Sequence, residues 1–128
     1  MSSEREIVTA PQAPAAIGPY SHAVRSGGLL YCSGQIPLDP ASGELVEGSV
    51  AVQARRCLDN LEAVAAAAGT QLARAVRITI YMTDLSAFSE VNEACAAAFP
   101  GDPPARVTVG VAALPRGAAV EIDAIIAA

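Results

Sequence analysis

Lysine is absent from this sequence, and all eight basic residues are arginines, scattered except for the adjacent pair Arg55-Arg56. No basic stripe is therefore available to a nucleic-acid backbone, and the formal net charge of −5 gives no attraction to anionic membranes. The N-terminus lacks the basic region and apolar run of a signal peptide, and no uncharged stretch has the length of a membrane span. We expect neither a nucleic-acid partner nor a membrane partner.

Cysteine and histidine are also scarce. The three cysteines, Cys32, Cys57 and Cys95, are odd in number and lack CxxC spacing, and His22 is the only histidine. These residues argue against a metal cage and predict reduced thiols in a cytoplasmic protein. The sequence also has no GxGxxG motif and no P-loop, so we expect no metal and no nucleotide cofactor.

Apolar residues, many of them alanine, are abundant. They make up 52% of the 128 residues and give a mean hydropathy of +0.38. Since this length suits one compact unit, residues 1–128 are predicted to form a single domain. A domain this small and this apolar is expected to bury a second surface against copies of itself.

The order of predicted elements defines the fold class. Apolar residues recur at helical spacing over residues 50–68, with Ser49 as the N-cap and Gly69 as the stop, and again over 86–99. Strand patterns cover residues 7–9, 29–35, 75–85, 105–114 and 119–127. This order predicts an α+β domain in which two helices cover one face of a mixed sheet, and oligomerisation is expected to close the other face.

The stretch PPARVTVGV, residues 103–111, places one arginine at the start of an apolar strand. Strand alternation puts Arg106 and Thr108 on one face of it. The turn that follows predicts a hairpin with the last strand, in which Arg106 and Glu121 or Asp123 would share a face. The pattern alone favours an arginine that reaches solvent or pairs with Glu121. The alternative is a bidentate clamp on a substrate carboxylate.

Three further hypotheses rest on single residues. Glu121 is a candidate general base that activates water, although the pattern alone favours a salt bridge. Cys32 and Ser33 are candidate nucleophiles paired with His22, but the sequence has no GxSxG elbow and no third residue to orient the histidine. The GPYS and SGQ segments suit loops whose backbone approaches a ligand, and ordinary turns would look the same.

Five segments in this order along the chain carry a family resemblance. They read APAAIGPYSHAV, SGQIPLDPASGELV, QARRCLDNLEAVAAAAG, YMTDLSAFSEVN and PPARVTVGVAALPRGAAVEIDAI. Together they resemble the RidA (YjgF) family of reactive-intermediate deaminases, over about residues 7–126. Several collinear motifs make this resemblance far more specific than one short pattern.

The resemblance implies a chorismate-mutase-like fold and a homotrimer whose sheets pack into a central barrel, with sites in the clefts between subunits. The implied activity is cofactor-independent hydrolysis of 2-imino acids and their enamine tautomers, such as 2-iminopropionate and 2-aminoacrylate, to 2-keto acids and ammonia. Such a 2-iminobutanoate/2-iminopropanoate deaminase protects pyridoxal-phosphate enzymes. The alternative left open is a non-catalytic regulatory module of the same fold that binds small carboxylic acids.

The resemblance also assigns roles by position. Arg106 matches the arginine that grips the substrate carboxylate, and Glu121 matches the glutamate near the attacking water. Tyr20 and Ser33 match pocket residues, and Gly34 offers backbone to the ligand. An imine is already electrophilic, so positioning, a charged clamp and an ordered water suffice for its hydrolysis.

The chain departs from the family pattern in three places. Thr108 stands near the position where many members have a cysteine, and it retains a hydroxyl that can hydrogen-bond. His22 stands where glutamine is common, and the loop before Pro104 is short. Family members have also been linked to ribonuclease or translation-inhibiting roles, which the acidic charge of this chain disfavours.

Overall fold

The structure is a computed structural model that describes residues 4–128. Its strands are β1 (Glu6–Val8), β2 (Ala23–Ser26), β3 (Leu29–Gln35), β4 (Ala75–Met82), β5 (Ala105–Gly110) and β6 (Val120–Ala127). Its α-helices are α1 (Val50–Ala67) and α2 (Phe88–Ala98). Short 3₁₀ turns are η1 (Leu72–Arg74), η2 (Leu85–Ala87) and η3 (Pro115–Gly117).

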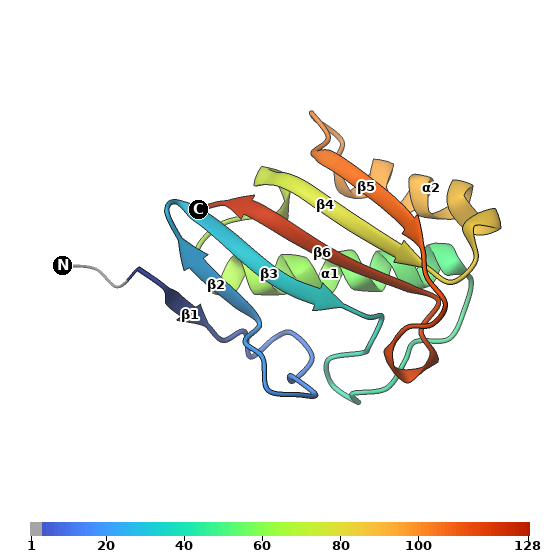
Figure 1. Ribbon diagram of the computed structural model, residues 1–128, viewed down its shortest axis with the longest axis horizontal. Coiled ribbons are helices and arrows are strands. Elements are labelled where there is room, and N and C mark those ends of the chain that lie inside the picture. The colour runs from blue at the N-terminus through green and yellow to red at the C-terminus, as the bar shows by residue number, and fades with distance from the viewer. Residues whose placement is uncertain (1–3) are drawn as a thin grey trace.

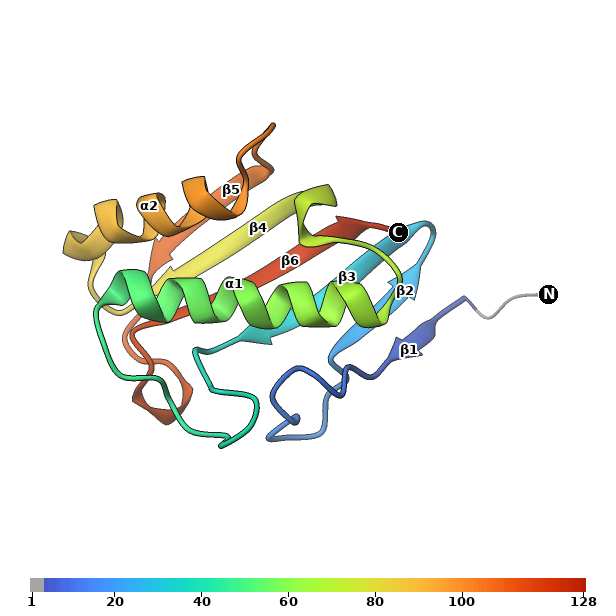
Figure 2. The same cartoon turned by 180° about the vertical axis from the view of Figure 1, so that it is seen from behind.

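All six strands form one mixed sheet in the order β1-β2-β3-β6-β4-β5. The β4–β5 pair is parallel and every other pair is antiparallel. Both helices lie on the same side of the sheet, as the two opposite views show (Figures 1 and 2). The predicted α+β class, with two helices on one face of a mixed sheet, is confirmed.

Helix α1 begins and ends where the sequence predicts. The Ser49 hydroxyl accepts a hydrogen bond from the Val52 amide at 3.3 Å, which caps the first turn. Gly69, with φ of +80°, allows the chain to leave the helix through the left-handed region. The buried stripe between these caps packs against the sheet and supplies one half of the core.

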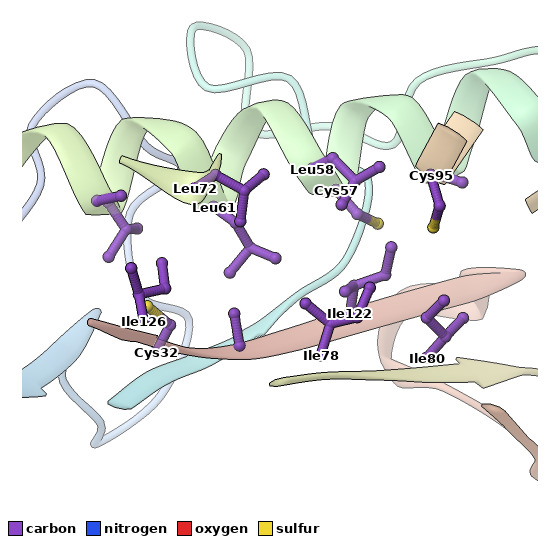
Figure 3. Packing of buried hydrophobic residues seen from close by; sticks show 14 of the residues in the cluster. Cys32, Cys57, Leu58, Leu61, Leu72, Ile78, Ile80, Cys95, Ile122 and Ile126 are labelled. Carbon is purple, nitrogen blue, oxygen red and sulfur yellow. The ribbon is translucent and has the colours of Figure 1, made fainter. Parts of the chain in front are cut away.

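The core lies between the helices and the sheet. Leu58 and Leu61 of α1 point toward the isoleucines of β4 and β6, as Figure 3 shows. Ile80, Ile122 and Ile126 are fully buried there, and each contributes about 1.5–3 kcal/mol through removal of its side chain from water. Strand alternation therefore assigns one face of each central strand to the core and leaves the opposite face uncovered by helices.

The predicted hairpin between the last two strands is wrong. Strand β5 lies at the sheet edge, parallel to β4, and β6 lies between β3 and β4 (Figure 1). The reason is the α2 crossover, because a strand–helix–strand unit places its two strands in parallel. After β5 the chain turns through η3 and continues as β6. Strand β6 lies on the other side of β4 and pairs with β4 on one edge and with β3 on the other.

This topology decides where the candidate site residues point. Arg106 is paired with Ile78, so it faces the helix side of the sheet. Glu121 is paired with Tyr81 and alternates with the buried Val120 and Ile122, so it faces the uncovered side. The expectation that Arg106 and Glu121 share a face is therefore wrong within one chain.

The uncovered face has apolar as well as polar side chains. Val107 and Val109 are each 38% exposed, and Tyr31 is 45% exposed. On the same face the Tyr81 hydroxyl donates a hydrogen bond to Asp123 at 2.9 Å. Neither α-helix in the described part of the chain has the length and apolar character needed to span a bilayer.

Asn60 provides a test of the packing that supports the site. It is fully buried on α1, and its amide donates to the carbonyls of Leu38 at 3.0 Å and Ile36 at 3.4 Å. We expect Asn60→Ala to lower the free energy of unfolding by about 2–4 kcal/mol in urea titrations, because both carbonyls lose a buried donor. Asp59→Ala, on an exposed ion pair of the same helix, is the control; equal stability of the two variants would contradict this account.

Candidate functional site

A small cavity opens at one end of the uncovered face. Its walls come from the loop before β2, the end of β3 and the start of β6, and its volume is about 270 Å³. The residues that line it, which we call the glutamate cleft, are Ile17, Tyr20, Ser33, Gly34, Ile36, Pro115 and Glu121. Four of the six residues predicted from the sequence therefore lie together.

A bulge in β3 allows Glu121 to lie across the strand. The β3–β6 register shifts between Cys32 and Gln35, which places Ser33 and Gly34 in the irregular segment. A Cβ atom at Gly34 would overlap the Oε2 atom of Glu121. Glycine lets the carboxylate rest directly on the backbone, because a side chain at residue 34 would displace the carboxylate from this position.

The environment of Glu121 favours its protonated form. Burial is the main cause that raises the pKa of this carboxyl, and the negative charge of Asp123 raises it further. A carboxylate held in this way is a stronger base than an exposed glutamate. It is therefore suited to accept a proton from water.

The geometry excludes the hypothesis of a nucleophile paired with His22. The Ser33 hydroxyl donates to the Ser21 carbonyl at 2.6 Å, and the His22 ring binds the backbone of Ala10 and Pro14 instead. Burial, with a smaller contribution from Asp123, raises the pKa of the Cys32 thiol to about 12. Neither side chain is activated for attack.

Tyr20 forms the outer wall of the cleft. Its side chain is 45% exposed, and its hydroxyl accepts a hydrogen bond from the Ile17 amide at 3.2 Å. The hydroxyl hydrogen remains available to a ligand. Tyr20 thus adds a hydroxyl to the cavity that Glu121 also lines.

Arg106 lines a different cavity, on the helix side of the sheet. Its guanidinium carbon lies 5.2 Å from the centre of the Phe88 ring, a cation–π geometry. The cavity has a volume of about 470 Å³, and we call it the arginine cavity. Its lining residues are Ile78, Asn92, Cys95, Ala96, Phe99, Pro100, Gly101, Pro103, Pro104 and Arg106.

Within residues 4–128 Arg106 forms no ion pair with Glu121, so the predicted pairing with that carboxylate is also wrong.

Helix α2 contributes residues that the sequence reasoning missed. Phe88, Asn92 and Cys95 follow one another at helical spacing and face Arg106 or its cavity. Periodicity had indicated Phe88 and Cys95 only as core residues. Burial raises the pKa of the Cys95 thiol, while the positive charge of Arg106 lowers it in part.

Thr108 lies two residues beyond Arg106 on the same face of β5. Its hydroxyl oxygen is buried and has no hydrogen-bond partner among the residues that the structure describes. A buried hydroxyl without a partner costs about 1–3 kcal/mol, so it is retained at the expense of stability. Thr108 therefore keeps an unused hydroxyl on the face of β5 that carries Arg106, although it does not line the arginine cavity.

The described residues contain no cluster of three or more histidine, cysteine, aspartate or glutamate side chains that could hold a metal ion. All three cysteines are buried and unpaired by disulfides. The chemistry available to the two cavities is consequently that of a carboxylate, a guanidinium, hydroxyls and backbone groups.

Comparison with solved structures identifies the class of fold. The crystal structure of a Rid-family protein from Yersinia pestis matches with a TM-score of 0.93 and 45% sequence identity, over 97% of this chain and 99% of the other. The six-stranded mixed sheet with two helices is therefore the fold of the Rid proteins.

Sequence comparison places the chain more narrowly. A family model described as Endoribonuclease L-PSP matches residues 10–128, and the chain belongs to this family, which includes the RidA and YjgF proteins. It is 54% identical over 123 residues to the protein DfrA of Myxococcus xanthus, and the alignment covers 94% of each chain. It is 46% identical over 121 residues to a Mus musculus protein named 2-iminobutanoate/2-iminopropanoate deaminase. This alignment covers 94% of this chain and 90% of the relative.

The raised pKa of Glu121 predicts a dependence of stability on pH. The folded chain keeps this proton at a pH where the unfolded chain has released it, so the free energy of unfolding falls as pH rises through that interval. We expect Glu121→Gln to be more stable than the wild type near neutral pH and equally stable near about pH 4. Urea titrations across this range measure it, with the exposed Glu93→Gln as control. A wild type more stable than Glu121→Gln at neutral pH would contradict the prediction.

Proposed function

We propose that this protein hydrolyses 2-imino acids, and the enamines that tautomerise to them, to 2-keto acids and ammonia. The observation that carries the proposal is the glutamate cleft, in which the Glu121 carboxylate has a raised pKa and rests on backbone, in a cavity that Tyr20 also lines. The name of the mouse relative supports the same reaction. Substrates of this size fit a cavity of about 270 Å³.

A complete site requires a second copy of the chain. Arg106 faces the helix side of the sheet and Glu121 faces the other side, so one chain does not present both to a small substrate. We therefore infer that the glutamate cleft of one copy meets the arginine cavity of a neighbour. The homotrimer implied by the family resemblance satisfies this requirement and covers the exposed Val107 and Val109.

In the proposed mechanism Arg106 holds the substrate by its carboxylate. A guanidinium matches this group through two parallel hydrogen bonds, and stacking on Phe88 restricts the orientation of the arginine. Thr108, two residues beyond Arg106 on the same face of β5, is the further substrate-binding residue that we propose on this side. The clamp fixes the C=N carbon against the water that attacks it.

Glu121 then acts on that water. The carboxylate takes a proton as the water oxygen bonds to C2 of the iminium, and the C=N electron pair moves to nitrogen to give a carbinolamine. Glu121 returns the proton to the nitrogen, the C–N bond breaks, and the hydroxyl proton is lost as the carbonyl forms. One iminium carboxylate and one water thus yield one 2-keto acid and one ammonium ion.

Such a reaction removes compounds that damage pyridoxal-phosphate enzymes, and this is the cellular role that we propose. The competing candidate is a regulatory module that binds small carboxylic acids in the same clefts without hydrolysis. Nucleic acid is disfavoured as a partner, despite the name of the family model, because the chain has a net charge of −5 and no lysine.

Arg106→Ala tests the proposed clamp. We expect kcat/KM for imine hydrolysis to fall about 100-fold or more, since a charge-assisted bidentate contact of ~3 kcal/mol is lost. The assay couples a dehydratase that releases the enamine to detection of the 2-keto acid. Arg55→Ala, an exposed arginine on α1, should leave turnover unchanged. Unchanged turnover in Arg106→Ala would refute the assignment; saturable 2-keto acid binding by a wild type that does not accelerate hydrolysis would favour the regulatory module.

Mixing variants tests whether the site is shared between copies. Arg106→Ala and Glu121→Gln, unfolded and refolded together in equal amounts, should regain activity in about one quarter of the sites, because a shared site draws each residue from a different copy. In the wild type refolded with an equal amount of the double variant, about one quarter of all sites should likewise be active. About one half would remain if each chain held a whole site, and the two single variants would then stay inactive.

A further inference from the structure

His22 lies outside the proposed chemistry, yet both of its ring nitrogens are engaged. The side chain is 8% exposed, and Nδ1 lies 2.9 Å from the Ala10 amide while Nε2 lies 2.8 Å from the Pro14 carbonyl. An amide N–H only donates and a carbonyl only accepts, so Nδ1 must be the acceptor and Nε2 must carry the proton. The contacts therefore require a neutral imidazole in one tautomer.

The same residue joins the two walls of the glutamate cleft. Its side chain binds the loop that leads to Tyr20, through Ala10 and Pro14. Its backbone carbonyl accepts the amide of Ser33 at 3.0 Å, in the segment of β3 that also holds Gly34. His22 thus fixes the position of the loop relative to β3.

The loop has little regular structure of its own. Between β1 and β2 its backbone hydrogen bonds are local, from Ala13 to Ala10 at 3.1 Å and from Tyr20 to Gly18 at 2.9 Å. Prolines remove amide donors along this segment, so regular pairing is not available to it. The ring of His22 supplies hydrogen bonds that tie the loop to the sheet.

We infer that His22 is a positioning residue, which holds Tyr20 in the glutamate cleft by binding the loop as a neutral imidazole protonated on Nε2. The effect on turnover rests on the proposed function, whereas the tautomer and the tethering of the loop do not. Glu121 is carried by β6 and Arg106 by β5, so loosening the loop leaves both groups in place. Substrate must then order the loop as it binds, which weakens apparent affinity rather than the chemical step.

Kinetics of three variants test the positioning role. We expect His22→Ala to raise KM about tenfold with kcat within about twofold of wild type, because only part of the population has Tyr20 in place. His22→Gln should restore KM to within about threefold, since its amide also offers one acceptor and one donor. Thr70→Val removes a part-buried hydrogen bond of 2.7 Å to Ala127, from a side chain that does not line the cleft, and serves as the control for the loss of a side-chain hydrogen bond elsewhere. A similar rise of KM in Thr70→Val, or a loss confined to kcat in His22→Ala, would overturn the inference.

Spectroscopy tests the tethering without any substrate. Because the chain has one histidine, its two ring nitrogens give the only imidazole signals in a nitrogen-15 spectrum. We expect shifts of a neutral ring protonated on Nε2, and faster hydrogen exchange across residues 10–20 in His22→Ala than in His22→Gln. A ring protonated on Nδ1, or exchange unaffected by either variant, would overturn the inference even if imine hydrolysis is established. Intact tethering in a protein that does not hydrolyse imines would instead count against the proposed function.

Discussion

The pairing of β4 with β5 on one edge and with β6 on the other is the constraint on which the rest of the structure depends. Successive side chains of a strand point to opposite faces, so the register of these pairs decides which residues meet. It directs Arg106 toward α2 and Glu121 toward the uncovered face. The separation of Arg106 and Glu121 into two cavities follows directly from this register, and the proposal that two copies combine to form a site rests on it.

The glutamate cleft shows how a carboxylate is held in a state that costs stability. A bulge in β3 and a glycine at its centre let Glu121 lie against backbone, where burial and Asp123 disfavour its charge. Thr108, on the face of β5 that carries Arg106, also costs stability, as a buried hydroxyl without a partner in the described part of the chain. Unfavourable groups that are retained in this way are typical of functional sites rather than of a core.

The surroundings of these groups are held by buried polar contacts from elements remote in sequence. Asn60 of α1 binds the segment that follows β3, and His22 binds the loop that carries Tyr20. Both residues use all or most of their hydrogen-bonding capacity, so the supporting segments have one preferred arrangement. The backbone around the cleft is therefore irregular, and these contacts hold it in one arrangement.

Local pattern was sufficient for much of this protein. Apolar periodicity and capping residues placed α1 between Ser49 and Gly69, and the alternation of each strand assigned Arg106 and Glu121 to defined faces of their own strands. Collinear motifs indicated the Rid fold and four residues that do share a cavity. What only the tertiary structure decided is which strands are neighbours, because pairing depends on long-range packing that no local pattern encodes. The separation of Arg106 from Glu121 follows from that pairing, and the approach of Asn92 to the arginine cavity and the contacts of His22 with the loop likewise depend on tertiary packing.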